Sequence, residues 1–90
     1  MTTEGVVTYL VEHYLPGATA EGFRATAGRL RSVAAAMADD GMAVRYRRAI
    51  LMPSDEAAFC VFEAASMDVI AQLYSRAGIA FDRIVDAVEV

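Results

Sequence analysis

Three side chains have the types and spacing that could do chemistry. Glu12 and His13 are neighbours in a run of β-forming residues, and Glu63 interrupts the apolar stretch Phe59-Cys60-Val61-Phe62-Glu63-Ala64. A carboxylate that leaves water needs a counter-charge, a metal or a proton, so packing alone rarely places one in an apolar strand. Two such carboxylates brought together predict either oxygen ligands for a metal or a catalytic acid and base with divergent pKa values.

Each of these side chains also has a purely structural interpretation. The carboxylates could be neutralised by Arg47 or Arg48 on an adjoining strand. Imidazole is the commonest metal ligand, yet consecutive strand residues point to opposite faces, so His13 joins Glu12 only if the strand end is irregular near Pro16. Otherwise His13 is packed under a helix or solvated.

The elements that must position these residues follow from periodicity and turn signals. β-branched and aromatic content with period-two alternation predicts four strands, at residues 6–15, 43–52, 59–64 and 81–90. Apolar residues spaced by three and four predict two helices, one from the N-cap Thr19 to about residue 37 and one from Ser66 to Gly78.

The resulting order, βαββαβ, predicts a ferredoxin-like α+β fold. Two helices cover one face of a four-stranded antiparallel sheet, with the first and third strands central and parallel to each other. The apolar face of Cys60, Phe62 and Ala64 is expected under the helices. Glu12 and Glu63 are then expected to look out of the uncovered face, near the C-terminal ends of neighbouring strands.

Other candidate residues are less specific. Cys60 has no basic neighbour that would lower its pKa, which predicts a core residue rather than a nucleophile. Tyr46 and Arg48 are expected on the uncovered face, where they could hold a cofactor or ligand. The alternatives are a dimer interface for the tyrosine and a solvated edge for the arginine.

Composition narrows the class of protein. Ninety residues with 57% hydrophobic content predict one domain, residues 1–90, whose small core would gain from a dimer. A net charge of −4 argues against a nucleic-acid partner. The start has no cationic segment and no stretch approaches ~20 apolar residues, which predicts a cytoplasmic protein without a membrane partner. A single cysteine excludes an internal disulfide.

The chain resembles a family of small actinobacterial ferredoxin-like proteins described as nickel-binding proteins or as a domain of unknown function. The matching stretches cover nearly the whole chain, and Phe59-Cys60-Val61-Phe62-Glu63-Ala64 is the most specific. The others are Leu10-Val11-Glu12-His13 with Leu15-Pro16-Gly17, Val44-Arg45-Tyr46, Arg76-Ala77-Gly78-Ile79 and Asp82-Arg83-Ile84. The resemblance implies a homodimer joined through sheet faces and binding of nickel.

Three functions remain open on this basis. The first is a homodimeric binding protein that holds nickel, another divalent transition metal or a small polar ligand at Glu12, His13 and Glu63, with Tyr46 nearby. The second is a cofactor-independent enzyme that isomerises, cyclises or oxidises a hydrophobic molecule in a dimeric α/β-barrel cavity, with Glu12 and Glu63 as catalytic groups. The third is an interaction module with no ligand.

Overall fold

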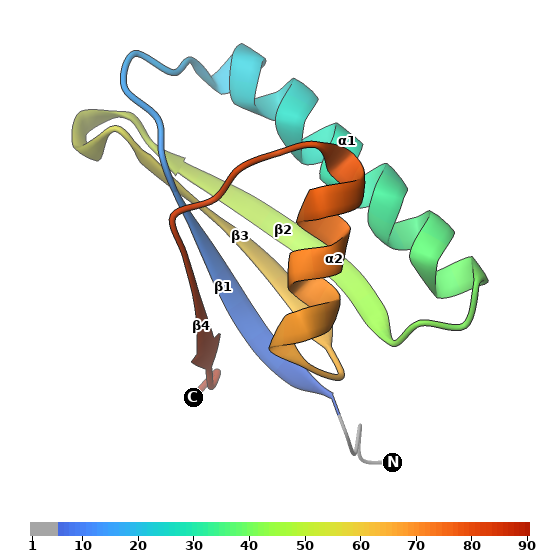
Figure 1. Cartoon of the computed structure of the whole chain (residues 1–90). Coiled ribbons are helices and arrows are strands. Elements are labelled where there is room, and N and C mark those ends of the chain that lie inside the picture. Colours follow the sequence, from blue (N-terminus) through green and yellow to red (C-terminus); the bar gives the residue numbers. More distant parts are fainter. Residues whose placement is uncertain (1–5) are drawn as a thin grey trace.

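The computed structural model describes residues 6–90 and has the element order β1 (Val7–Tyr14), α1 (Ala20–Asp39), β2 (Val44–Met52), the 3-10 turn η1 (Pro53–Asp55), β3 (Ala57–Ala64), α2 (Met67–Ala77) and β4 (Arg83–Ala87). The four strands form one sheet in the order β2-β3-β1-β4. Both helices lie on the same face of this sheet (Figure 1). The predicted ferredoxin-like α+β fold is confirmed. The start of the chain, on which the localisation prediction partly depends, lies outside the described residues.

The first and third strands are central as predicted, but the prediction that they run parallel was wrong. All three neighbouring strand pairs are antiparallel. The crossover through α1 joins β1 to β2, which are parallel to each other and leave room for one strand between them. The hairpin after β2 then places β3 in that position, antiparallel to both neighbours. The C-terminal end of β1 therefore lies beside the N-terminal end of β3.

Local sequence accounts for both helices. The Thr19 hydroxyl accepts a hydrogen bond from the Gly22 N–H at 3.0 Å and begins α1, and Ser66 caps α2 in the same way through Val69. Gly78 ends α2 in the left-handed conformation, with φ of 70°. No helix within residues 6–90 is long and apolar enough to cross a membrane.

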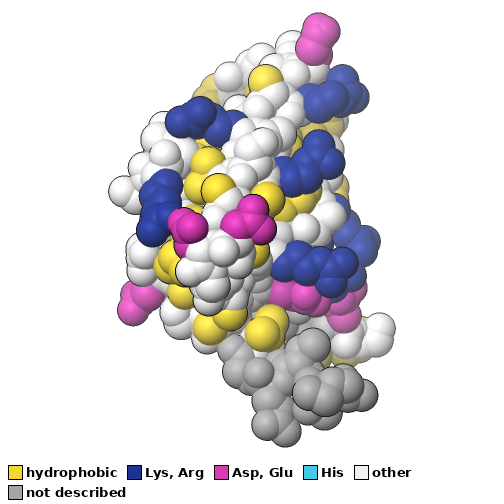
Figure 2. All heavy atoms as spheres, turned by 90° about the vertical axis from the view of Figure 1, so that its right-hand side faces the viewer, with side chains coloured by type: hydrophobic (Ala, Val, Ile, Leu, Met, Phe, Trp, Pro, Cys, Tyr) yellow, Lys and Arg dark blue, Asp and Glu magenta, His cyan; other side chains and the backbone are white. Residues whose placement is uncertain are grey.

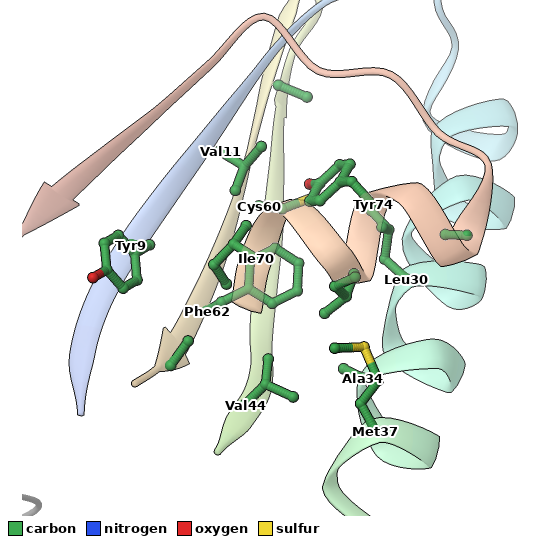
Figure 3. Packing of buried hydrophobic residues seen from close by; sticks show 14 of the residues in the cluster. Tyr9, Val11, Leu30, Ala34, Met37, Val44, Cys60, Phe62, Ile70 and Tyr74 are labelled. Atoms are coloured by element: carbon green, nitrogen blue, oxygen red, sulfur yellow. The ribbon is translucent and has the colours of Figure 1, made fainter. Parts of the chain in front are cut away.

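The core lies between the helices and the covered face of the sheet. Val11 of β1 and Phe62 of β3 are fully buried and face the apolar stripes of both helices, represented by Leu30 and Ile70 (Figure 3). Burying such side chains contributes about 1.5–3 kcal/mol each. The opposite face of the sheet carries no helix and is called the open face below.

A β-bulge in β2 changes which residues reach the open face. Tyr46 pairs with Phe62 and Arg48 pairs with Val61, so Arg47 is an extra residue in the ladder. Tyr46 consequently packs edge-on against Phe62 on the helix side, and the prediction that it lies on the open face was wrong. Arg48 lies on the open face, as predicted.

Candidate functional site

Glu12 and Glu63 both lie on the open face, but they do not form a pair. Glu12 is opposite Phe59 in the sheet, whereas Glu63 is opposite Thr8. The two positions are therefore four residues apart along the strands, or about 13 Å. The expectation that the carboxylates meet depended on parallel strands, and the antiparallel register overturns it. Within one chain they cannot act as a coupled acid and base.

Glu63 is held by arginines of the neighbouring strand. Its carboxylate lies 3.3 Å from Arg47 Nη1 and 3.7 Å from Arg45 Nη1. Arg47 also donates to Glu89 at 2.7 Å. This network is the structural alternative considered for Glu63, with Arg47 as one of the two partners named from the sequence. A carboxylate so neutralised has less charge to offer a metal.

Glu12 occupies the other end of the open face. Its Oε1 accepts a hydrogen bond from Arg83 Nε at 3.2 Å, and its side chain is 34% exposed to solvent. The partner comes from β4 rather than from Arg47 or Arg48 on β2, because β4 is the strand adjacent to β1 at this position. Glu12 therefore remains accessible to a ligand or to a second protein.

His13 lies on the helix side, opposite to Glu12, and no irregularity turns it round. The side chain is 2% exposed, and its Nε2 lies 2.8 Å from the Tyr74 hydroxyl on α2. Phe23 packs against the imidazole ring in an edge-on arrangement. Burial lowers the pKa of His13, and the nearby Asp82 carboxylate opposes that shift. Its burial in the core therefore favours the neutral form of the imidazole.

A hollow of about 590 Å³ opens at the end of the sheet where β1 stops. Because it lies at the sheet end, it is lined by residues from both faces, including Glu12 and His13. Two further carboxylate residues line it, Asp55 and Asp82. Asp82 also accepts from the Tyr14 N–H at 2.6 Å, while its own N–H donates to the Glu12 carbonyl at 2.8 Å. Sequence reasoning missed both aspartates.

Cys60 and Tyr74 form a buried polar contact above the sheet. The Tyr74 side chain reaches from α2 to Cys60 on β3 (Figure 3). Burial raises the pKa of the Cys60 thiol to about 11 and also raises the pKa of Tyr74. A thiol with so high a pKa is a poor nucleophile at neutral pH. The prediction that Cys60 belongs to the core is confirmed.

The surface seen from the side of α1 carries scattered positive charge (Figure 2). Arginine side chains are spread between hydrophobic and acidic groups rather than gathered into a stripe. Proteins that bind a phosphate backbone present a continuous basic stripe or patch. This side of the molecule does not have one.

Comparison with known proteins assigns the family. The sequence profile described as nickel responsive protein SCO4226-like matches residues 9–86. The chain belongs to the SCO4226-like family. The resemblance found from the sequence is confirmed.

The fold is also found in a solved member. The crystal structure of SCO4226 from Streptomyces coelicolor A3(2) matches with a TM-score of 0.71 at 19% identity, covering 92% of this chain and 98% of that one. At this identity the similarity supports the fold. No curated protein matches the chain.

The metal donors of this chain can be compared with what nickel requires. Nickel sites in proteins favour imidazole or thiolate donors, whereas oxygen donors alone give weaker sites. The one histidine of the sequence, His13, is hydrogen-bonded to the Tyr74 hydroxyl, and the one cysteine, Cys60, is buried. Among residues 6–90, no three His, Cys, Asp or Glu side chains lie close enough together to hold one ion. A single copy of this part of the chain supplies at most a portion of a metal site.

Proposed function

We propose that this chain is a small homodimeric binding protein that takes up a divalent transition metal at the Glu12 end of its open face. The observation that carries the proposal is the hollow beside Glu12, which Asp55 and Asp82 also line, so that three carboxylate residues of the described chain face one space without forming a complete ligand group in a single copy. The family description names its members nickel responsive, which makes nickel the first metal to test. The known order of affinities also favours nickel over manganese, iron and cobalt at a given set of donors.

The open face supports the dimer. Ile50 of β2 is 48% exposed on this face, and Val61 of β3, which no helix covers, is 9% exposed. Val61 pairs with Leu10 of β1, and Phe59 of β3 pairs with Ile50, so these four residues form a contiguous apolar surface. Surfaces of this kind commonly mark protein interfaces, because covering them removes apolar area from water. A second copy bound face to face is the occupant we propose.

The dimer would also complete the metal site. One chain lacks a three-residue donor group in its described part, so we infer that the second copy or water supplies the missing ligands. Glu12 is the proposed anchor, with Asp82 and Asp55 as donors lining the same hollow. His13 is left out of the proposed ligand set because Tyr74 occupies its Nε2. Glu63 is left out because two arginines already neutralise it.

Native mass spectrometry with elemental analysis of untagged protein tests this proposal. We expect a dimer that takes up added Ni²⁺ and releases it on mild acidification, because the carboxylate ligands become protonated. Glu12→Gln should abolish uptake, and Arg83→Gln should strengthen it because Arg83 competes for the same carboxylate. Glu63→Gln is the matched control on the same face and should bind as the parent does. Uptake unchanged in Glu12→Gln, or lost equally in both glutamate variants, would refute the assignment.

A further inference from the structure

A second hollow on the open face lies away from Glu12. This open hollow has a volume of about 260 Å³ and is lined mainly by apolar side chains, among them Leu10, Ile50, Val61 and Ala87. Arg48 and Glu89 supply its charged groups. The bulge at Arg47 places Arg48 in this position, because without the extra residue the alternation of β2 would turn Arg48 toward the helices.

The charges around this hollow do not balance. The Glu89 carboxylate accepts from Arg47 at 2.7 Å, and Glu63 is shared by Arg45 and Arg47. Arg48 has no carboxylate within ion-pair distance among the described residues. One guanidinium therefore stands on an apolar face without a counter-charge from this part of its own chain.

A guanidinium on such a face needs an anion once the face is covered, because removing an unpaired charge from water is costly. We propose that the hollow binds a small organic carboxylate with an apolar body, whose carboxylate pairs with Arg48. Guanidinium matches a carboxylate through two parallel hydrogen bonds, and Leu10 and Val61 would contact the apolar body. This inference rests on the proposed dimer, because the second copy is what covers Arg48. In that dimer two hollows would face each other, and their combined volume would lie in the range of roughly 300–1,000 Å³ that is typical of small-molecule sites.

Octanoate and octan-1-ol are suitable probes because they share an apolar chain and differ in charge. Titration of the isotope-labelled protein, followed by amide chemical shifts, should show octanoate perturbing Leu10 and Val61. Arg48→Met should weaken octanoate binding by roughly tenfold, since a charge-assisted hydrogen bond is lost, and should leave octan-1-ol binding unchanged. Arg45→Met is the matched control, because Arg45 is on the same strand but does not line the hollow. It should change octanoate binding by less than about twofold.

Equal binding of the acid and the alcohol, or equal effects of the two arginine variants, would overturn the proposal. Light scattering on the same samples separates it from the dimer. If Arg48→Met dissociates a dimer and octanoate does not bind, Arg48 pairs with a carboxylate of the partner and the ligand proposal is wrong. If the parent protein is monomeric but binds octanoate through Arg48, the dimer proposal fails and the ligand site stands.

Discussion

The hydrogen bond between His13 and Tyr74 predicts that Tyr74→Phe will destabilise the fold. Tyr74 is 1% exposed, and its hydroxyl lies 2.8 Å from His13 Nε2. The substitution removes one oxygen and leaves the ring in place, so the packing against Phe62 and Phe81 is kept. What is lost is the partner of a buried imidazole nitrogen. An unsatisfied buried polar group costs about 1–3 kcal/mol.

Urea unfolding at about pH 7.5, at one fixed protein concentration, measures this loss. For a domain of this size, 1 kcal/mol corresponds to a Tm shift of roughly 4–8 °C. Tyr14→Phe is the matched control, because Tyr14 is 60% exposed and its substitution should change stability by less than about 0.5 kcal/mol. If both variants lose the same small amount, the buried hydrogen bond does not stabilise the fold and the reasoning fails.

Two further predictions concern ionisation in the core. The free energy of unfolding should fall as pH is lowered through about 6.5, the usual imidazole pKa, because burial lowers the pKa of His13 in the native state and the unfolded chain then binds more protons. A flat profile between about pH 5 and 7.5, or the same slope in a His13→Asn variant, would contradict it. Cys60, whose pKa burial raises to about 11, should react with a thiol reagent orders of magnitude more slowly in the native protein than in urea; rapid native labelling would show that β3 opens readily.

The fold could be predicted from the sequence because local signals agreed with one another. The caps at Thr19 and Ser66 and the left-handed Gly78 mark the helix ends where the structure has them. The alternation of β1 and β3 correctly assigned Glu12, His13, Cys60 and its neighbours to their faces. The last strand is shorter than predicted, Arg83–Ala87 instead of residues 81–90. Phe81 packs on Tyr74 before the strand begins, a contact between a loop and α2 that periodicity does not reveal.

The candidate site was harder to predict because it depends on relations between strands. The prediction that the central strands are parallel placed Glu12 and Glu63 close together, which was wrong, although it assigned each side chain to the correct face of the sheet. The bulge at Arg47 also puts Tyr46 and Arg48 on opposite faces, although simple alternation assigns them to the same face. Local sequence gives no clear signal for a single inserted residue in a strand of alternating arginines and apolar residues.

The two faces of the sheet divide the polar residues into those that are fixed and those that can bind. His13 and Cys60 face the helices, where Tyr74 contacts both, so neither is free to exchange partners without opening the core. Ligand binding is therefore expected on the open face and at its ends. There, Glu12 and Arg48 are separated by two strand spacings and by two residues along the sheet, or roughly 12 Å.

At that distance the two groups have no shared ligand and interact weakly across a solvated surface. A cation at the Glu12 end and an organic anion at Arg48 would therefore occupy the same open face without competing for it. A dimer formed through that face would couple them indirectly. If both ligands bind the dimer more tightly than the single chain, each shifts the protein toward the dimer and so raises the affinity for the other, and these two effects are equal by linkage.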